Sequence, residues 1–165
     1  MGTRSMIGIE NPYNKQVKAV YCHWDGYLEH NGAILARHYS NSAKANNLIA
    51  LGDISSLRPE IGEKHTFSRL DSTIPEAEYE ALYGNMTTYY GRDRGETGAE
   101  FRVFLTAADA IEHYEHSWAE YYYLFRYSKA TDYESGDWFY KKGSKGRWLK
   151  LSTAIRKLNA DECAG

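Results

Sequence analysis

The pattern of hydrophobic and polar positions predicts two β-strands near the start of the chain. Residues 3–10 and 17–24 are rich in apolar, β-branched and aromatic side chains, and the sequence Asn11-Pro12-Tyr13-Asn14-Lys15 between them is typical of a turn. Two strand-like runs that are joined by so short a turn most simply form an antiparallel hairpin. We therefore expect the fold to begin with a β-hairpin.

Further along, apolar positions recur at the spacing of amphipathic helices. The predicted helices are residues 31–40, 42–51, 76–83, 106–116 and 152–159. Ser42 is placed to cap the second of these helices and Gly52 to end it, and Ser152 or Thr153 is placed to cap the last. Residues 62–71 have no clear period, which indicates an irregular surface segment.

Strand patterns return in the second half of the chain. The further predicted strands are residues 86–90, 101–105, 118–127, 138–142 and 147–151. The last two flank the turn Gly143-Ser144-Lys145-Gly146 and predict a second hairpin. No linker or internal repeat divides the sequence, so residues 1–165 are expected to form a single domain. These elements predict an α+β fold with a mainly antiparallel sheet and with helices packed largely on one face.

Composition narrows the class of protein. The formal net charge is −2, which argues against a partner as polyanionic as long nucleic acid. Cys22 and Cys163 are the only cysteines and imply no disulfide framework, and no run approaches the length of a membrane span. We therefore expect a cytoplasmic protein with no membrane partner. Its 15 tyrosines suit ligand pockets and the interfaces of a homo-oligomer, although half-exposed sheets also favour tyrosine.

The densest chemistry lies where the second predicted strand ends. A period of two sets the polar side chains there on one face, which consists of Tyr21, His23 and Asp25. The opposite face consists of Val20, Cys22 and Trp24. The helix that starts near Asn31 would then offer unpaired backbone N–H groups to an anion. The alternative is an ordinary Asp-Gly turn closed by large core residues, with His23 and Asp25 as a structural pair.

Arginines from two other segments are candidates to lie close to Tyr21, His23 and Asp25, at the corner where the second predicted strand ends. Arg4 begins the first strand, and the hairpin would bring it close to His23 and Asp25, either as a buried ion pair or as an anion contact. The loop of residues 91–98 combines three glycines with Arg92 and Arg94, which suits phosphate binding. Its alternative is a solvated loop with self-compensating charges. The loop fits neither a Walker motif nor a dinucleotide fingerprint.

Two further clusters have simpler explanations. His113 and His116 have helical spacing with neighbouring glutamates, but their surroundings are typical of a solvated helix face rather than a metal site. The C-terminal hairpin has seven basic and no acidic residues between Asp137 and Asp161, interleaved with Trp138, Tyr140 and Trp148. Such a mixture suits a nucleotide or single-stranded nucleic acid, but lysines also protect an edge hairpin from aggregation.

Four blocks of the chain carry a resemblance. They are Thr3-Arg4-Ser5, then Tyr21-Cys22-His23-Trp24-Asp25-Gly26-Tyr27 with Gly32 and Leu35 behind it, then Gly52-Asp53-Ile54-Ser55-Ser56-Leu57, and Tyr90-Gly91-Arg92-Asp93-Arg94-Gly95-Glu96. Together they resemble a family of small accessory proteins that bacteriophages and mobile elements encode, and the resemblance covers roughly residues 3–96. By analogy with phage counter-defence factors, it implies a sponge that sequesters a cyclic nucleotide immune signal inside the infected bacterial host.

The residues independently suit such a ligand. The predicted ligand-binding residues are Arg4, His23, Trp24, Asp25, Tyr27, Tyr90, Arg92 and Arg94. The arginines would hold phosphate, the aromatic rings would stack on bases, and His23 with Asp25 would fix the orientation. The chain has no phosphodiesterase histidine pair, metal cluster or nucleophile elbow, so we expect no cofactor and favour binding without turnover. The alternatives are a hydrolase that uses His23 and Asp25, or an inhibitor that binds a host defence enzyme.

Overall fold

The computed structural model describes residues 2–65, 75, 77–78, 81, 84–129 and 132–164. The described strands are β1 (Arg4–Glu10), β2 (Val17–Cys22), β3 (Ile54–Ser56), β4 (Thr88–Tyr89), β5 (Arg102–Phe104), β6 (Ala119–Lys129), β7 (Asp132–Lys142) and β8 (Leu149–Lys150). They form one sheet in the order β4-β3-β2-β1-β6-β7-β8, and β5 pairs with β2. β5 pairs with the first half of β2, and β3 pairs with the last residue of β2. Two separate strands therefore share one edge of β2.

Most strand pairs in the sheet are antiparallel, as the sequence predicts. β1 and β2 form the expected hairpin, in which Ser5 pairs with Cys22 and Glu10 with Val17. The β6–β7 and β7–β8 pairs are also antiparallel, whereas β1–β6 and β2–β3 are parallel. β7 begins at Asp132, six residues before its predicted start, because the long strand β6 supplies a hydrogen-bonding partner for that polar segment.

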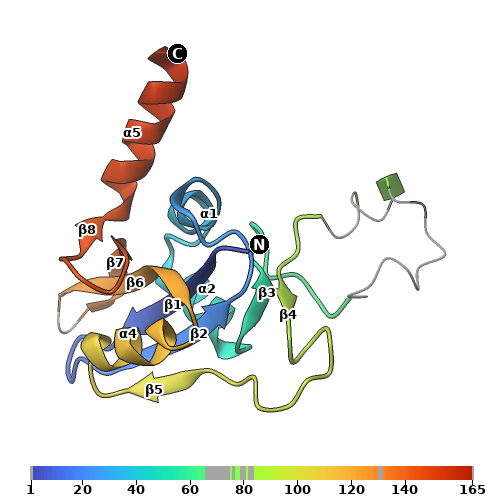
Figure 1. The fold of residues 1–165 in the computed structure, drawn as a ribbon, viewed down its shortest axis with the longest axis horizontal. Helices are drawn as coiled ribbons and strands as arrows, with labels where there is room; N and C mark the ends of the chain where they lie inside the picture. Colours follow the sequence, from blue (N-terminus) through green and yellow to red (C-terminus); the bar gives the residue numbers. More distant parts are fainter. Residues whose placement is uncertain are drawn as a thin grey trace.

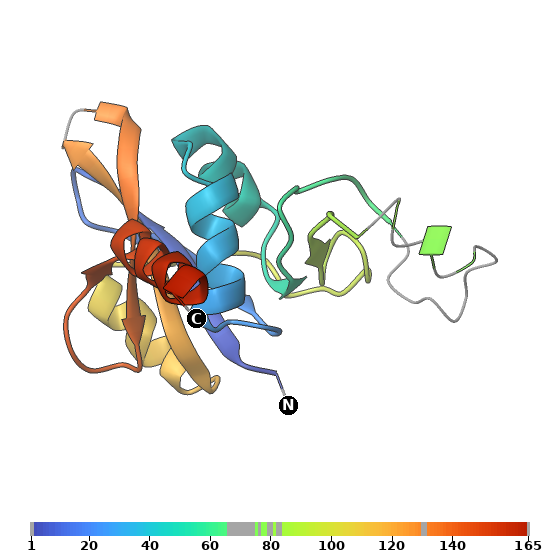
Figure 2. The same ribbon diagram turned by 90° about the horizontal axis from the view of Figure 1, so that it is seen from above.

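Helices cover both faces of the sheet. The described helical segments are the π-helical turn η1 (Leu28–Gly32), α1 (Ala33–His38), α2 (Ser42–Ala50), α4 (Ala107–Glu115) and α5 (Leu151–Ala164). Figure 2 shows α1 and α2 on one side of the strands and α4 on the other. Leu35, Leu48 and Ile155 belong to the core on the first side, and Ile111 and Tyr114 to the core on the α4 side. The expectation of helices largely on one face is therefore corrected for α4.

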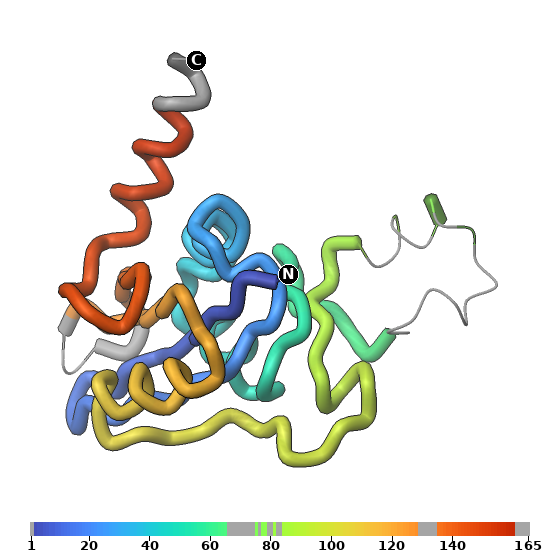
Figure 3. Tube along the Cα trace, viewed as in Figure 1, coloured from blue at the N-terminus to red at the C-terminus, as the bar shows by residue number. Residues whose placement is uncertain are grey.

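The two ends of the chain are placed differently. The start of β1 lies within the body of the molecule, whereas α5 extends away from the sheet (Figures 1 and 3). α5 contributes the buried residues Leu151 and Ile155 and the partly buried Leu158 to the core. None of the helices among the described residues is both long and apolar enough to cross a membrane.

Two predicted helix boundaries need correction. Asn41, not Ser42, caps α2, because its side-chain oxygen accepts a hydrogen bond from the backbone N–H of Lys44. α5 begins at Leu151, so Ser152 and Thr153 lie inside the helix rather than at its cap. Most of the predicted helix at residues 76–83 lies outside the described residues. The predicted cap of α4 is confirmed, since Thr106 accepts a hydrogen bond from the backbone of Asp109.

Candidate functional site

The turn after β2 is fixed onto the start of β1 by backbone contacts. The N–H of Gly26 donates to the carbonyl oxygen of Thr3 at 2.7 Å, and the buried Tyr123 hydroxyl donates to the carbonyl of Gly26 at 2.7 Å. A Cβ atom on Gly26 would lie 2.7 Å from that Thr3 oxygen, so only glycine allows this close approach. Asp25 adopts a left-handed conformation with a φ of 56°, which Asp tolerates better than most residues.

The buried side chain of Asn31 stabilises the turn after β2. Its side chain is fully buried, and its amide nitrogen lies 3.3 Å from the carbonyl oxygen of Trp24, the hydroxyl of Ser5 and the sulfur of Cys22. The sequence assigned Asn31 only to a helix start, because nothing in the local pattern marks a buried amide. The amide therefore links β1, β2 and the turn at one buried point.

The predicted open helix start is wrong. The N–H of Asn31 donates to the carbonyl of Asp25 at 3.2 Å, and the N–H of His30 donates to that of Tyr27 at 3.2 Å. The turn closes on itself as η1, and α1 that follows is six residues long. Backbone donors that the chain already uses cannot hold an anion, so the binding chemistry of this corner depends on side chains.

β3 brings a second block of the resemblance alongside this turn. The N–H of His23 donates to the carbonyl of Ile54 at 3.0 Å, and the N–H of Trp24 donates to that of Ser55 at 3.1 Å. The N–H of Tyr21 donates to a carboxylate oxygen of Asp53 at 2.9 Å. These bonds extend the β2–β3 pairing beyond the end of β2 and hold the backbone of His23 in place.

Arg4, Tyr21 and His23 form the centre of the corner. Tyr21 and His23 lie on the same side of the chain, as the period of two predicts, with the Tyr21 hydroxyl 2.7 Å from Nδ1 of His23. Burial raises the pKa of Tyr21, and the nearby positive charge of Arg4 opposes that shift. Burial, followed by the positive charges of Arg4 and Arg94, lowers the pKa of His23 below its ordinary value. The imidazole is therefore neutral at pH 7 and feels the charge of two cations from distant parts of the chain.

Tyr90 and Arg94 close the corner from the loop after β4. The guanidinium carbon of Arg94 lies 5.0 Å from the centre of the Tyr90 ring, and its Nε lies 3.1 Å from Glu96. Burial raises the pKa of Tyr90, and the nearby Ser55 side chain and the charge of Arg94 oppose that shift. β4 pairs with β3, so the sheet order itself places this loop beside the end of β2. All four blocks of the resemblance thus meet at one corner.

Arg92 serves the interior of the loop instead. Its guanidinium donates to both carboxylate oxygens of the buried Asp93, to the carbonyl of Thr87 at 2.8 Å and to that of Gly62 at 3.1 Å. It also lies over the ring of Tyr89, at 4.8 Å from the ring centre. These contacts engage the donors that a phosphate would need, so Arg92 is a structural residue of this loop.

The remaining predicted ligand-binding residues are spread around the turn. Trp24 is 44% exposed and meets the ring of His23 edge to face, with 4.5 Å between ring centres. Asp25 acts on Tyr27 rather than on His23, and its negative charge raises the pKa of Tyr27. Tyr27 lines a hollow with Tyr121 and Lys142 on the β6–β7 side, away from the loop after β4. The structure therefore brings together Arg4, His23, Trp24, Tyr90 and Arg94, and sets Asp25 and Tyr27 aside.

The histidines of α4 have other neighbours. The ring of His113 packs against Phe104 and Tyr114, and Nδ1 of His116 donates to the carbonyl of Glu112 at 2.8 Å. Among the described residues, no group of three or more His, Cys, Asp or Glu side chains is arranged to hold a metal ion.

Comparisons with protein-family models, with curated proteins and with solved structures gave no match for this chain.

Proposed function

We propose that this corner binds a small, nucleotide-type ligand and holds it without cleaving it. The observation that carries the proposal is that the positive charges of Arg4 and Arg94 both act on His23. The two arginines come from the first strand and from the loop after β4, and two guanidinium groups near a neutral donor suit a phosphate group.

Arg94 can exchange its present partner for a ligand. Its ion pair with Glu96 joins two partly exposed side chains, 34% and 49% exposed, and such surface pairs contribute little free energy. A phosphate carries more charge than the carboxylate and can accept the same bidentate hydrogen bonds. Stacking on Tyr90 would keep the guanidinium in place during the exchange.

Flat rings beside the cations suit the base of a nucleotide. Trp24 is partly exposed next to His23, and Tyr90 is half-buried beneath Arg94. A base that stacks on Trp24 would lie beside the imidazole, whose ring nitrogen offers a polar edge. Charge, rings and polar edges together favour a nucleotide over a simple anion.

The surroundings of His23 favour binding over hydrolysis. A general base is usually oriented by a carboxylate that bonds its second ring nitrogen, and here Nδ1 contacts the Tyr21 hydroxyl instead. Asp25, the predicted partner, interacts with Tyr27. Two neighbouring arginines also oppose the imidazolium that forms when a histidine accepts a proton. His23 therefore acts as a neutral hydrogen-bonding group in this proposal.

The biological role follows from the resemblance of the four blocks. We propose that the protein sequesters a cyclic nucleotide immune signal for a bacteriophage in the cytoplasm of its host. We also propose a homo-oligomer, since Tyr13 and Trp118 are 63% and 75% exposed and offer apolar area for a subunit interface. Light scattering coupled to size-exclusion chromatography would measure the oligomeric state, and a monomer at all concentrations would overturn that part.

The experiment that tests the function incubates purified protein with a panel of cyclic di- and trinucleotides. Bound ligand is measured by isothermal titration calorimetry, and the protein is then denatured so that chromatography identifies the released ligand. Intact released nucleotide supports sequestration. Altered nucleotide would replace the proposal by hydrolysis, and the absence of binding across the panel would overturn it in favour of a protein-binding inhibitor.

Matched variants assign the binding to the corner. Arg4→Gln and Arg94→Gln are each expected to weaken the Kd by at least about tenfold, because each removes a charge-assisted contact to phosphate. Arg102→Gln is the control, since Arg102 is exposed on β5 and its loss changes the net charge equally. Equal weakening by all three variants would mean that binding does not occur at this corner.

A further inference from the structure

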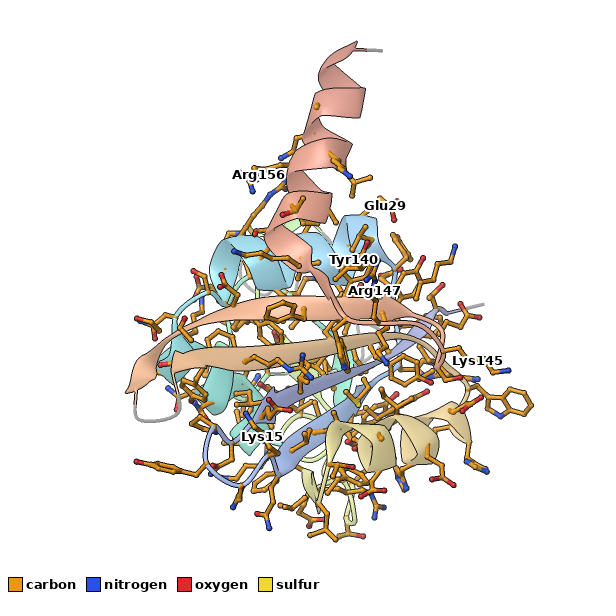
Figure 4. The ribbon with its side chains drawn as sticks, turned by 90° about the vertical axis from the view of Figure 1, so that its left-hand side faces the viewer. Lys15, Glu29, Tyr140, Lys145, Arg147 and Arg156 are labelled. Atoms are coloured by element: carbon orange, nitrogen blue, oxygen red, sulfur yellow. The ribbon has the colours of Figure 1, made fainter. Side chains whose placement is uncertain are left out.

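A second hollow lies at the opposite edge of the sheet, between η1 and the β7–β8 hairpin. Its volume is about 600 Å³, and its lining includes Glu29, Tyr121, Tyr140, Lys142 and Arg147. Figure 4 shows Tyr140, Arg147 and Glu29 close together beneath α5, with Lys145 farther out at the hairpin tip. The nucleotide-type site proposed above is built from β1 to β4. The hollow between η1 and the β7–β8 hairpin, called the groove below, is therefore a separate surface.

The groove is strongly basic. Its cations are Lys141, Lys142, Lys145 and Arg147, and Glu29 is the acid in its lining. Lys141 turns partly toward Trp148, at 5.1 Å from the ring centre, and burial lowers its pKa. Within the described part of the chain, Lys142, Lys145 and Arg147 take part in no ion pair. None of the three is therefore held in a direct ion pair, although Glu115 and Glu120 line an adjacent hollow with Lys142.

Two half-buried tyrosines supply flat surface inside this basic groove. Tyr121 on β6 and Tyr140 on β7 both pack partly against the core, which fixes their rings while part of each stays exposed. Burial and the nearby charge of Glu29 raise the pKa of Tyr121, so its phenol stays neutral. A fixed ring with a neutral hydroxyl can stack on a base and donate a hydrogen bond.

Positive charge continues beyond the groove along α5. Arg156 and Lys157 are exposed on this helix, whereas Lys150, which precedes it, is paired with Asp137 at 3.8 Å. In Figure 4, Arg156 on α5 and Lys145 at the hairpin tip lie far apart, with Arg147 and Tyr140 between them. The cations thus form an extended track rather than a single cluster, which favours a linear polyanion over one small phosphate.

We propose that this groove binds a short stretch of single-stranded nucleic acid. The backbone phosphates would follow the cationic track, and unpaired bases would reach the rings of Tyr121 and Tyr140. A duplex keeps its bases stacked and paired, so it cannot use the rings. The net charge of −2 does not prevent this, because screening limits charge interactions to roughly 8–10 Å at moderate salt and only the local charge acts on a bound strand.

The test measures fluorescence anisotropy of a labelled 12-nucleotide oligouridylate and an oligothymidylate with the protein of residues 1–165 at 50–200 mM salt. Arg147→Glu is expected to weaken binding by at least about tenfold and to make the slope of log K against log salt shallower by roughly 0.7. Tyr140→Leu keeps an apolar side chain but removes the ring. It is expected to weaken binding by at least about fivefold with the salt slope unchanged.

Lys15→Glu is the matched control. Lys15 is exposed in the β1–β2 turn, away from the groove in Figure 4, and its reversal changes the net charge as much as Arg147→Glu. Equal weakening by both reversals would overturn the proposal, as would equal affinity for a duplex of the same length. Uridine monophosphate that binds as tightly as the 12-nucleotide strand would also overturn it, because a track should gain affinity with length.

Discussion

The hydroxyl of Tyr21 lies 2.7 Å from Nδ1 of His23, and this contact sets the chemistry of the corner. A guanidinium can only donate, so the positive charge of Arg4 favours an orientation in which the lone pairs of the Tyr21 oxygen face the guanidinium. This favours donation of the hydroxyl proton to Nδ1, which places the ring proton of neutral His23 on Nε2. His23 would then present its Nε2–H group as a hydrogen-bond donor to an anion. A nitrogen that already carries a proton cannot act as a general base.

Replacing Arg94 should raise the pKa of His23. The positive charge of Arg94 is one of the causes that lower this pKa, so Arg94→Gln relieves part of the shift toward the ordinary value of 6.5. An NMR titration of the imidazole nitrogens measures the pKa and the tautomer together. Arg102→Gln is the control, because Arg102 acts on His113 rather than on His23. An unchanged His23 pKa in Arg94→Gln would contradict the placement of Arg94.

Sequence periodicity was sufficient to predict the structure where the chain forms regular strands. The hairpin of β1 and β2 and the shared side of Tyr21 and His23 follow from a strand period of two, which depends only on backbone geometry. Tyr21 could also have been included in the site by the same argument. Asp25 could not be excluded, because its left-handed φ of 56° breaks the period at the turn.

The different roles of Arg92 and Arg94 could not be read from the sequence. Both lie in the same glycine-rich loop, and only the folded loop shows that Asp93 between them is buried and needs a cationic partner. The buried position of Asn31 is likewise a consequence of three segments that meet in space. Long-range contacts of this kind carry no local sequence signal.

Arg92→Gln should destabilise the protein, whereas Arg94→Gln should not. Asp93 is buried and also accepts from the N–H groups of Tyr89 at 2.7 Å and His65 at 3.1 Å. Loss of Arg92 leaves this carboxylate without its cation, which costs about 2–4 kcal/mol of unfolding free energy. Loss of the partly exposed Arg94 changes it by less than about 1 kcal/mol. Urea unfolding measures both, and a similar loss in the two variants would contradict the assignment.

Asn31→Ala should weaken the turn after β2. The substitution leaves the Trp24 carbonyl and the Ser5 hydroxyl without the amide donor in a buried place, at a cost of about 1–3 kcal/mol. Thermal unfolding followed by circular dichroism provides the measurement. Asn47→Ala is the matched control, because Asn47 is exposed in α2 and alanine favours a helix. The interpretation fails if the two alanine variants unfold at the same temperature.

Stability should fall between pH 7.5 and pH 5.5 through two histidines. Burial and the nearby arginines lower the pKa of His23, and burial and Arg102 lower that of His113, whereas each has its ordinary value of 6.5 in the unfolded chain. Below pH 6.5, and down to the folded pKa, the unfolded chain therefore binds more protons than the folded one. The stabilisation is fully present above pH 6.5 and is lost as the pH falls toward the folded values.

Urea unfolding at the two pH values checks this expectation, and a double variant, His23→Gln with His113→Gln, isolates its cause. Burial raises the pKa of Asp53, and that shift acts in the opposite direction, since it favours the folded state as the pH falls. Because Asp53 is present in both proteins, the difference between them reports the histidines alone. The double variant should lose less unfolding free energy than the original chain between pH 7.5 and 5.5. Equal losses would show that neither histidine has a lowered pKa in the folded state.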